Sequence, residues 1–123
     1  MQGRTSFRST EELMYASTKV VENKFTGNTT IGVIITNGKF GKSSLCKIAG
    51  MGHDGYARSI RPVHTTADGD SLYALSVGDV DADQDLTGTL AAETVSEAII
   101  RAVESAESSY GYPARKDLLT AGM

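Results

Sequence analysis

The sequence predicts an α/β fold of two strands and two to three helices. Two apolar runs of strand length each end at a glycine, and amphipathic stretches of helical period lie before, between and after them. The 123 residues, 40% of them hydrophobic and 22% charged, are typical of one soluble globular domain. We therefore expect the order helix, strand, helix, strand, helix around a single core.

The first part of the chain predicts one helix and one strand. Residues 9–23 begin with Ser9 and Thr10 ahead of two glutamates, a capping pattern, and place apolar residues among polar ones, which predicts a helix. Residues 29–36 form a β-branched run with few polar members, which predicts a buried strand. The pair at positions 37 and 38, Asn-Gly, then indicates a turn.

A second helix is expected after this turn. Ser43 or Ser44 can cap it, and apolar residues at roughly helical spacing continue to about Ser59. Its glycines, Gly50, Gly52 and Gly55, each cost about 1 kcal/mol relative to alanine in a helix interior. We expect close packing against a neighbouring backbone to offset that loss.

The rest of the chain predicts a loop, a strand and a long helix. The loop covers residues 61–70, and the apolar residues of 71–77 predict a second strand that ends at Gly78. Residues 85–108 carry a broad apolar stripe of helical period, and the tail after Tyr110 is expected to be irregular. Two strands rarely form a sheet that is stable alone, so we expect another chain to supply further strands.

Composition excludes several classes of function. Twelve Lys and Arg against 15 Asp and Glu give a net charge of −3 without a basic cluster, which argues against nucleic-acid and membrane partners. Cys46 is the single cysteine, so an intrachain disulfide and a cysteine-based zinc site are excluded. The first ten residues lack the apolar core of a secretory signal, and we expect a cytoplasmic protein.

Two short motifs have simpler interpretations than ligand binding. Gly41-Lys42-Ser43 follows a strand and opens a helix, as in a phosphate-binding loop, but Thr36 stands where the first glycine is needed. A turn and helix cap is the favoured interpretation.

Alternating aspartates resemble a calcium loop, yet Gln84 and Leu90 occupy its glycine and glutamate positions. Acidic residues before a helix are favoured by its N-terminal partial charge, which explains the run without a metal. These aspartates are Asp79, Asp81, Asp83 and Asp85.

The two histidines show no metal-binding pattern. His53 lies in the predicted second helix and His64 in the loop, and neither has a second ligand at zinc spacing. Both are interpreted as structural. Because His64 is close in sequence to Asp68 and Asp70, a role in positioning that loop stays open.

Four sequence blocks occur together in one order and cover roughly residues 26–108. Jointly they resemble the L-aminopeptidase/D-esterase (DmpA-type) family of self-cleaving N-terminal-nucleophile peptidases, which also includes β-aminopeptidases and nylon-oligomer hydrolases. The resemblance implies an αββα sandwich of the type shared with ornithine acetyltransferases, of which this chain would be a two-strand, two-to-three-helix segment. The blocks are Asn28-Thr29-Thr30-Ile31-Gly32-Val33, Met51-Gly52-His53-Asp54-Gly55 with Ala57-Arg58, Arg61-Pro62-Val63-His64-Thr65, and Asp68-Gly69-Asp70.

The resemblance also implies a site. Members are precursors cut into a large subunit and a small one that begins with serine or threonine, here Thr29. Residues 1–28 would then be the end of the large subunit and 29–123 the catalytic small-subunit segment. The Thr29 hydroxyl would attack the Asn28 carbonyl, and its freed α-amine, with a pKa of about 7.7–8.0, would serve as the base. Asp68 and Asp70 match two aspartates that orient the threonine, and no metal or organic cofactor is implied.

Part of the family's active site comes from the large subunit, so more than one function stays open for this chain. The family's large subunit supplies a lysine, an asparagine and much of the substrate pocket, so the resemblance implies a need for large-subunit residues. Exposed sheet edges and the glycine-rich helix call for partners, so we also expect homo-oligomer assembly. The expected substrate is a peptide or other small amide. The alternatives are a noncatalytic fragment or structural module of this fold and an acyl transferase similar to ornithine acetyltransferase.

Overall fold

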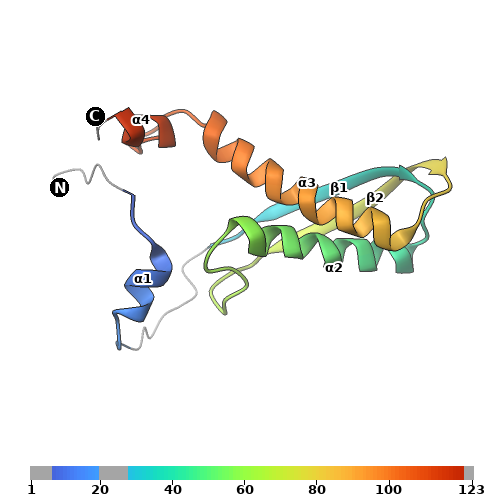
Figure 1. Cartoon of the computed structure of the whole chain (residues 1–123), viewed down its shortest axis with the longest axis horizontal. Coiled ribbons are helices and arrows are strands. Elements are labelled where there is room, and N and C mark those ends of the chain that lie inside the picture. Colours follow the sequence, from blue (N-terminus) through green and yellow to red (C-terminus); the bar gives the residue numbers. More distant parts are fainter. Residues whose placement is uncertain (1–6, 20–27, 121–123) are drawn as a thin grey trace.

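The computed structural model describes residues 7–19 and 28–120. In chain order the elements are α1 (Thr10–Tyr15), β1 (Ile31–Gly38), α2 (Lys42–Ser59), β2 (Ser71–Val80), α3 (Gln84–Ser105) and α4 (Arg115–Thr120). The strands β1 and β2 pair in parallel, and α2 and α3 run alongside each other and along the strand pair (Figure 1). The predicted α/β class and its two strands are therefore confirmed.

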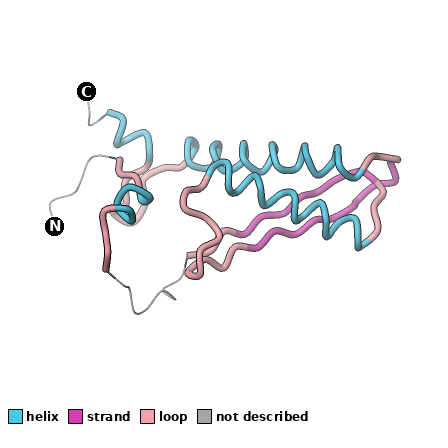
Figure 2. Tube along the Cα trace, turned by 60° about the horizontal axis from the view of Figure 1, so that its bottom comes forward, coloured by secondary structure: helices cyan, strands magenta, loops and turns pink. Residues whose placement is uncertain are grey.

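Helices cover one face of the sheet. Along β1 the exposed fraction alternates residue by residue, with Gly32 and Ile34 on the covered face and Val33 on the other. Figure 2 shows both long helices on the same side of the strands. The opposite face is apolar and, among the described residues, uncovered, because its six side chains are 50% to 73% exposed. They are Ile31, Val33, Ile35, Tyr73, Leu75 and Val77.

Glycines bring α2 close to its neighbours. A Cβ on Gly55 would lie 2.4 Å from the carbonyl oxygen of Ala92 in α3, and one on Gly52 would lie 2.5 Å from Cδ2 of Leu72 in β2. The expected close packing against a neighbouring backbone is thus confirmed at Gly55, whereas Gly52 lies against side chains of the sheet. Gly50 differs, because a Cβ there would meet no atom of the described residues within 4 Å.

Both strands run further than expected. The predicted turn at Asn37 and Gly38 is wrong, because these residues end β1, where the register shifts after Thr36 and Gly38 N–H donates to the Thr36 hydroxyl over 3.0 Å. The predicted end of the second strand is also wrong, since β2 passes through Gly78 to Val80. A Cβ on Gly78 would lie 2.4 Å from the Asn37 carbonyl oxygen, so the glycine permits close strand approach rather than a turn.

The two long helices begin in different ways. The prediction that Ser43 or Ser44 caps α2 is wrong, because α2 already begins at Lys42 and its N-cap residue is Gly41, which has no side chain. The Asp83 carboxylate caps α3 by accepting the Leu86 N–H over 2.8 Å, which agrees with the helix-terminus interpretation of the acidic run.

The chain ends differ from expectation. Ser9 caps α1 as predicted, accepting the Glu12 N–H over 3.3 Å, but this helix ends at Tyr15; residues 20–23 of the predicted span lie outside the described part. The predicted irregular tail is wrong, because α4 forms where the Asp117 carboxylate accepts the Ala114 N–H over 2.9 Å. In the described ranges, no helix has the length and apolar character that crossing a bilayer requires.

Candidate active site

The segment before β1 lies against the segment before β2. Asn28 and Asp68 form a parallel bridge, in which the Gly69 N–H donates to the Asn28 carbonyl over 2.9 Å. Two residues further on, the Ser71 N–H donates to the Thr30 carbonyl, also over 2.9 Å. Thr29 lies between these two bonds. The structure therefore brings all four sequence-predicted site positions to one end of the sheet.

Asp70 is held by both of its carboxylate oxygens. Oδ1 accepts the Thr30 N–H over 3.0 Å, and Oδ2 lies 3.1 Å from Nδ1 of His64. The side chain is only 5% exposed, so these partners replace most of its contact with water. His64 has a positive φ of 57°, a conformation uncommon outside glycine, at a bend of the loop that precedes Asp70. Asp70 thereby fixes the backbone immediately after Thr29.

Asp68 closes its own short turn. Its Oδ2 accepts both the hydroxyl and the backbone N–H of Thr65, each over 2.8 Å. The Thr65 hydroxyl first, and then its backbone N–H, hold the pKa of Asp68 below the ordinary value, because both donors favour the charged carboxylate. Asp68 is thus ionised at neutral pH where its backbone meets Asn28.

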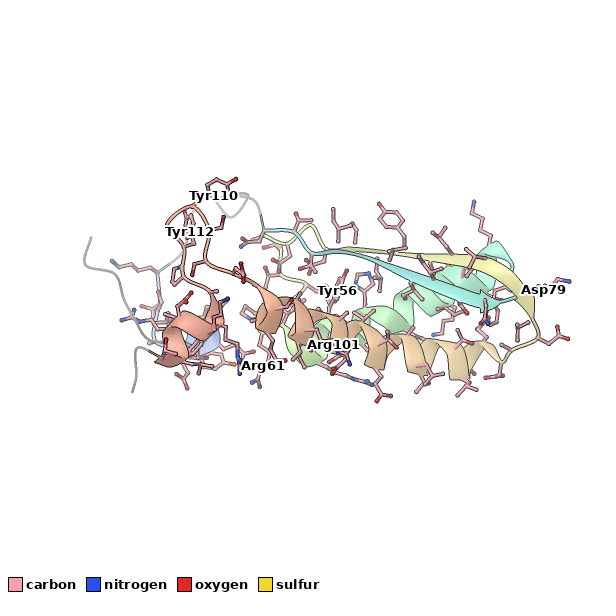
Figure 3. The ribbon with its side chains drawn as sticks, turned by 90° about the horizontal axis from the view of Figure 1, so that it is seen from above. Tyr56, Arg61, Asp79, Arg101, Tyr110 and Tyr112 are labelled. Atoms are coloured by element: carbon pink, nitrogen blue, oxygen red, sulfur yellow. The ribbon has the colours of Figure 1, made fainter. Side chains whose placement is uncertain are left out.

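Aromatic rings of α2 pack against His64 in the loop that leads to Asp70. The rings of His53 and Tyr56 on α2 meet edge to face at 5.2 Å, and His53 meets the His64 ring at 4.8 Å. Figure 3 shows Tyr56 between the helices and the strands, with Asp79 at the far end of the strand pair. Burial, and then the negative charge of Asp70, raise the pKa of Tyr56, so its hydroxyl remains a neutral donor.

Sequence reasoning missed part of this site. Roles were assigned to the two aspartates of the Asp68-Gly69-Asp70 block but none to Gly69, whose N–H bonds the Asn28 carbonyl. Tyr56 lies within the second helix that the sequence predicts, and the pattern assigns it no role in the site. The signal that was available is that His64, Gly69 and Tyr56 lie in or next to the four blocks. His64, left open as a positioning residue, does contact Asp70.

The other sequence candidates stay apart from this end of the sheet. Gly41 is the N-cap of α2, and the acidic run leads into α3 at the opposite ends of the strands. Within residues 7–19 and 28–120, no three His, Cys, Asp or Glu side chains are grouped so that they could hold a metal ion. The chemistry available is that of a hydroxyl beside its own preceding carbonyl, with two carboxylates and a histidine nearby.

Comparison with known proteins gives a consistent set of relatives. The profile described as Peptidase family S58 matches residues 2–116. An uncharacterized aminopeptidase of Mycobacterium tuberculosis is 33% identical over 106 residues, covering 74% of this chain and 31% of the relative. Its counterpart in Mycobacterium leprae is 35% identical over 101 residues, covering 70% and 28%.

A third relative aligns with a shorter part of the chain. The 6-aminohexanoate-oligomer endohydrolase of Paenarthrobacter ureafaciens is 40% identical over 55 residues, covering 45% of this chain and 16% of the enzyme. No solved structure matches the chain. The chain therefore spans less than a third of the length of these curated relatives.

Proposed function

This chain belongs to peptidase family S58, and from that membership we propose that it carries the nucleophile of an amide hydrolase that activates itself by cleaving the Asn28–Thr29 bond. In this proposal residues 1–28 are the end of a large subunit and residues 29–123 the small-subunit segment. The observation that carries it is the pairing of Asn28 with Asp68 and of the Thr30 N–H with Asp70, which flank Thr29 on both sides.

Cleavage and turnover use the same hydroxyl. In the intact chain the Thr29 hydroxyl attacks the Asn28 carbonyl and forms an ester, which water then hydrolyses. The freed α-amine, with an unperturbed pKa of about 7.7–8.0, takes the hydroxyl proton when a substrate amide is attacked. The acyl-threonine ester that results is released by a second water.

The carboxylates orient the groups that react. Asp70 is already bonded to the peptide nitrogen of Thr30, and Asp68 is ionised beside Asn28. After cleavage, the two carboxylates would hydrogen-bond and orient the new terminus at Thr29 and influence the pKa of its amine. Electrostatic attraction thus keeps the new terminus at the site after the bond is broken.

The substrate and partner follow from the family. The relatives named aminopeptidase and 6-aminohexanoate-oligomer endohydrolase support a peptide or another small amide as substrate. We propose that large-subunit residues complete the pocket and cover the apolar sheet face, whose six side chains are at least 50% exposed. Assembly into homo-oligomers belongs to the same proposal.

Intact-mass measurement tests self-cleavage directly. The purified 13.0 kDa chain is incubated at neutral pH, and the expected result is loss of residues 1–28. Thr29→Ala should abolish the cleavage and Thr29→Ser should retain it, whereas Thr30→Ala, which removes the neighbouring hydroxyl, should cleave like the unaltered chain. Cleavage of Thr29→Ala at the same bond would refute the proposal.

A noncatalytic structural module is the second candidate. It is favoured by the uncovered sheet face, which shows that the described elements do not bury their own apolar surface. A single 13.0 kDa species that persists through long incubation would support this alternative.

A further inference from the structure

The carbonyl that self-cleavage must attack already has a hydrogen-bond donor. The Gly69 N–H points at the oxygen of Asn28 over 2.9 Å, within the bridge that pairs Asn28 with Asp68. The same kind of bond joins the Ser71 N–H to the Thr30 carbonyl. Only the first of these two carbonyls belongs to the Asn28–Thr29 bond.

Residue 69 also lies beside the attacking group. A Cβ on Gly69 would be 3.0 Å from the Thr29 hydroxyl oxygen and 3.9 Å from the Asn28 oxygen. A side chain here would therefore press on the nucleophile. Glycine leaves the hydroxyl room to move while its own N–H stays on the carbonyl oxygen.

Two hydrogen bonds at Thr30 fix the backbone beside the Asn28–Thr29 bond. Asp70 binds the Thr30 N–H and Ser71 binds the Thr30 carbonyl, so the backbone directly after Thr29 is fixed on both sides. A fixed donor stabilises developing charge without reorganisation at the moment of reaction.

We propose that the Gly69 backbone N–H is the oxyanion donor for cleavage of the Asn28–Thr29 bond, an inference that rests on the proposed self-cleavage. The Thr29 Oγ bonds to the Asn28 carbonyl carbon, and the carbonyl oxygen becomes an anion that accepts the Gly69 N–H. The C–N bond then breaks, the hydroxyl proton passes to the Thr29 nitrogen, and an Asn28 ester with a free α-amine results. Water hydrolyses the ester to an Asn28 carboxylate and restores the hydroxyl.

The sharpest test replaces the donor atom alone. Cys46, the single cysteine, provides a ligation point at which residues 46–123 can be joined synthetically to residues 1–45. In one chain an ester oxygen replaces the Gly69 N–H, and in the matched control an ester oxygen replaces the Ser71 N–H. Both lose one ladder bond, but only the first loses the donor to the attacked carbonyl.

The expected result is cleavage slowed about 10²–10³-fold by the ester at 69, as for loss of one oxyanion donor, and by less than tenfold by the ester at 71. Equal rates for both esters, in an unaltered chain that does cleave, would overturn the inference and leave the proposed function standing. An unaltered chain that never cleaves removes the proposed function of this polypeptide and this inference with it.

A second measurement does not depend on cleavage. In the Thr29→Ala chain, a through-hydrogen-bond coupling between the Gly69 nitrogen and the Asn28 carbonyl carbon should be observable by NMR. Gly69→Ala keeps the N–H but crowds the Thr29 hydroxyl. Added to the Thr29→Ala chain it should preserve the coupling, and in a chain that retains Thr29 it should slow cleavage. Absence of the coupling in a folded Thr29→Ala chain would overturn the inference even if the ester at 69 misfolds.

Discussion

The hydroxyl of Tyr56 in α2 donates a hydrogen bond to the backbone carbonyl of Ser71, the first residue of β2, over 3.0 Å. Tyr56 is 1% exposed, so this bond is made away from solvent. It joins the helix layer to the sheet immediately after Asp70. The position of the candidate site therefore depends on a contact between two layers of the fold.

Removing this hydroxyl should destabilise the protein. Tyr56→Phe leaves the Ser71 carbonyl without its donor, and we expect the free energy of unfolding to fall by about 1 kcal/mol. Tyr110→Phe is the control, since Tyr110 is 98% exposed and should change little. Urea unfolding measures both, and an equal effect of the two variants would show that the Tyr56 bond contributes nothing.

The two kinds of helical glycine should respond in opposite directions to alanine. Gly55→Ala places a Cβ 2.4 Å from the Ala92 carbonyl oxygen, which should push α2 and α3 apart and lower the thermal midpoint. Gly50→Ala meets nothing within 4 Å in the described part of the chain and should stabilise the helix by up to about 1 kcal/mol. Thermal unfolding of both variants decides this, and a stable Gly55→Ala protein would contradict the packing argument.

Asp68 should make the loop sensitive to acid. Because its folded pKa is lowered from the ordinary 3.8, its contribution to stability is present above that unfolded value and is lost as pH falls through the folded value. The Thr65 amide shift, followed by NMR, should titrate with a midpoint below 3.8. In Asp68→Asn that titration should vanish, and a midpoint above 3.8 in the unaltered chain would be inconsistent with the Thr65 bonds.

His64 should matter for self-cleavage through Asp70. In His64→Phe the carboxylate loses a donor, and a charge-assisted bond of roughly 1.5–3 kcal/mol, if expressed fully in the barrier, corresponds to about 10–100-fold slower cleavage. His53→Phe is the control within the same cluster, because the buried His53 Nδ1 has no hydrogen-bond partner among the described residues. Similar slowing by both variants would indicate a packing effect rather than positioning of Asp70.

The exposed sheet face should tolerate charge. Ile35 and Leu75 are opposite each other on β1 and β2 and are 62% and 50% exposed. We expect the pair Ile35→Lys with Leu75→Glu to change stability by less than about 1 kcal/mol and to reduce self-association in sedimentation. Ile34→Lys, on the helix-covered face, should be far more destabilising, and a similar loss in both would mean that the first face is covered.

Local pattern predicted the elements well where side chains alone decide them. The Ser9 cap and the apolar stripe of the long helix depend on neighbouring residues. The prediction of a buried strand over residues 29–36 is wrong for one face, because every second side chain of β1 is exposed. The turn predicted at Asn37 and Gly38 and the strand end predicted at Gly78 are both wrong, because glycine favours a close approach of two strands as well as a turn. The α4 helix was missed because its start depends on Asp117 reaching back to Ala114 and Ser108.

The sequence by itself determined the positions Asn28–Thr29 and Asp68–Asp70. They follow from four blocks that occur together in one order, and this order can be read without knowing how the blocks lie in space. Only the tertiary structure decided what these residues contact. Parallel pairing brings Asn28 opposite Asp68, directs the Gly69 N–H at the Asn28 carbonyl and sets the Thr30 N–H on Asp70. Contacts between residues about 40 positions apart depend on strand register and helix packing, and a local pattern carries neither.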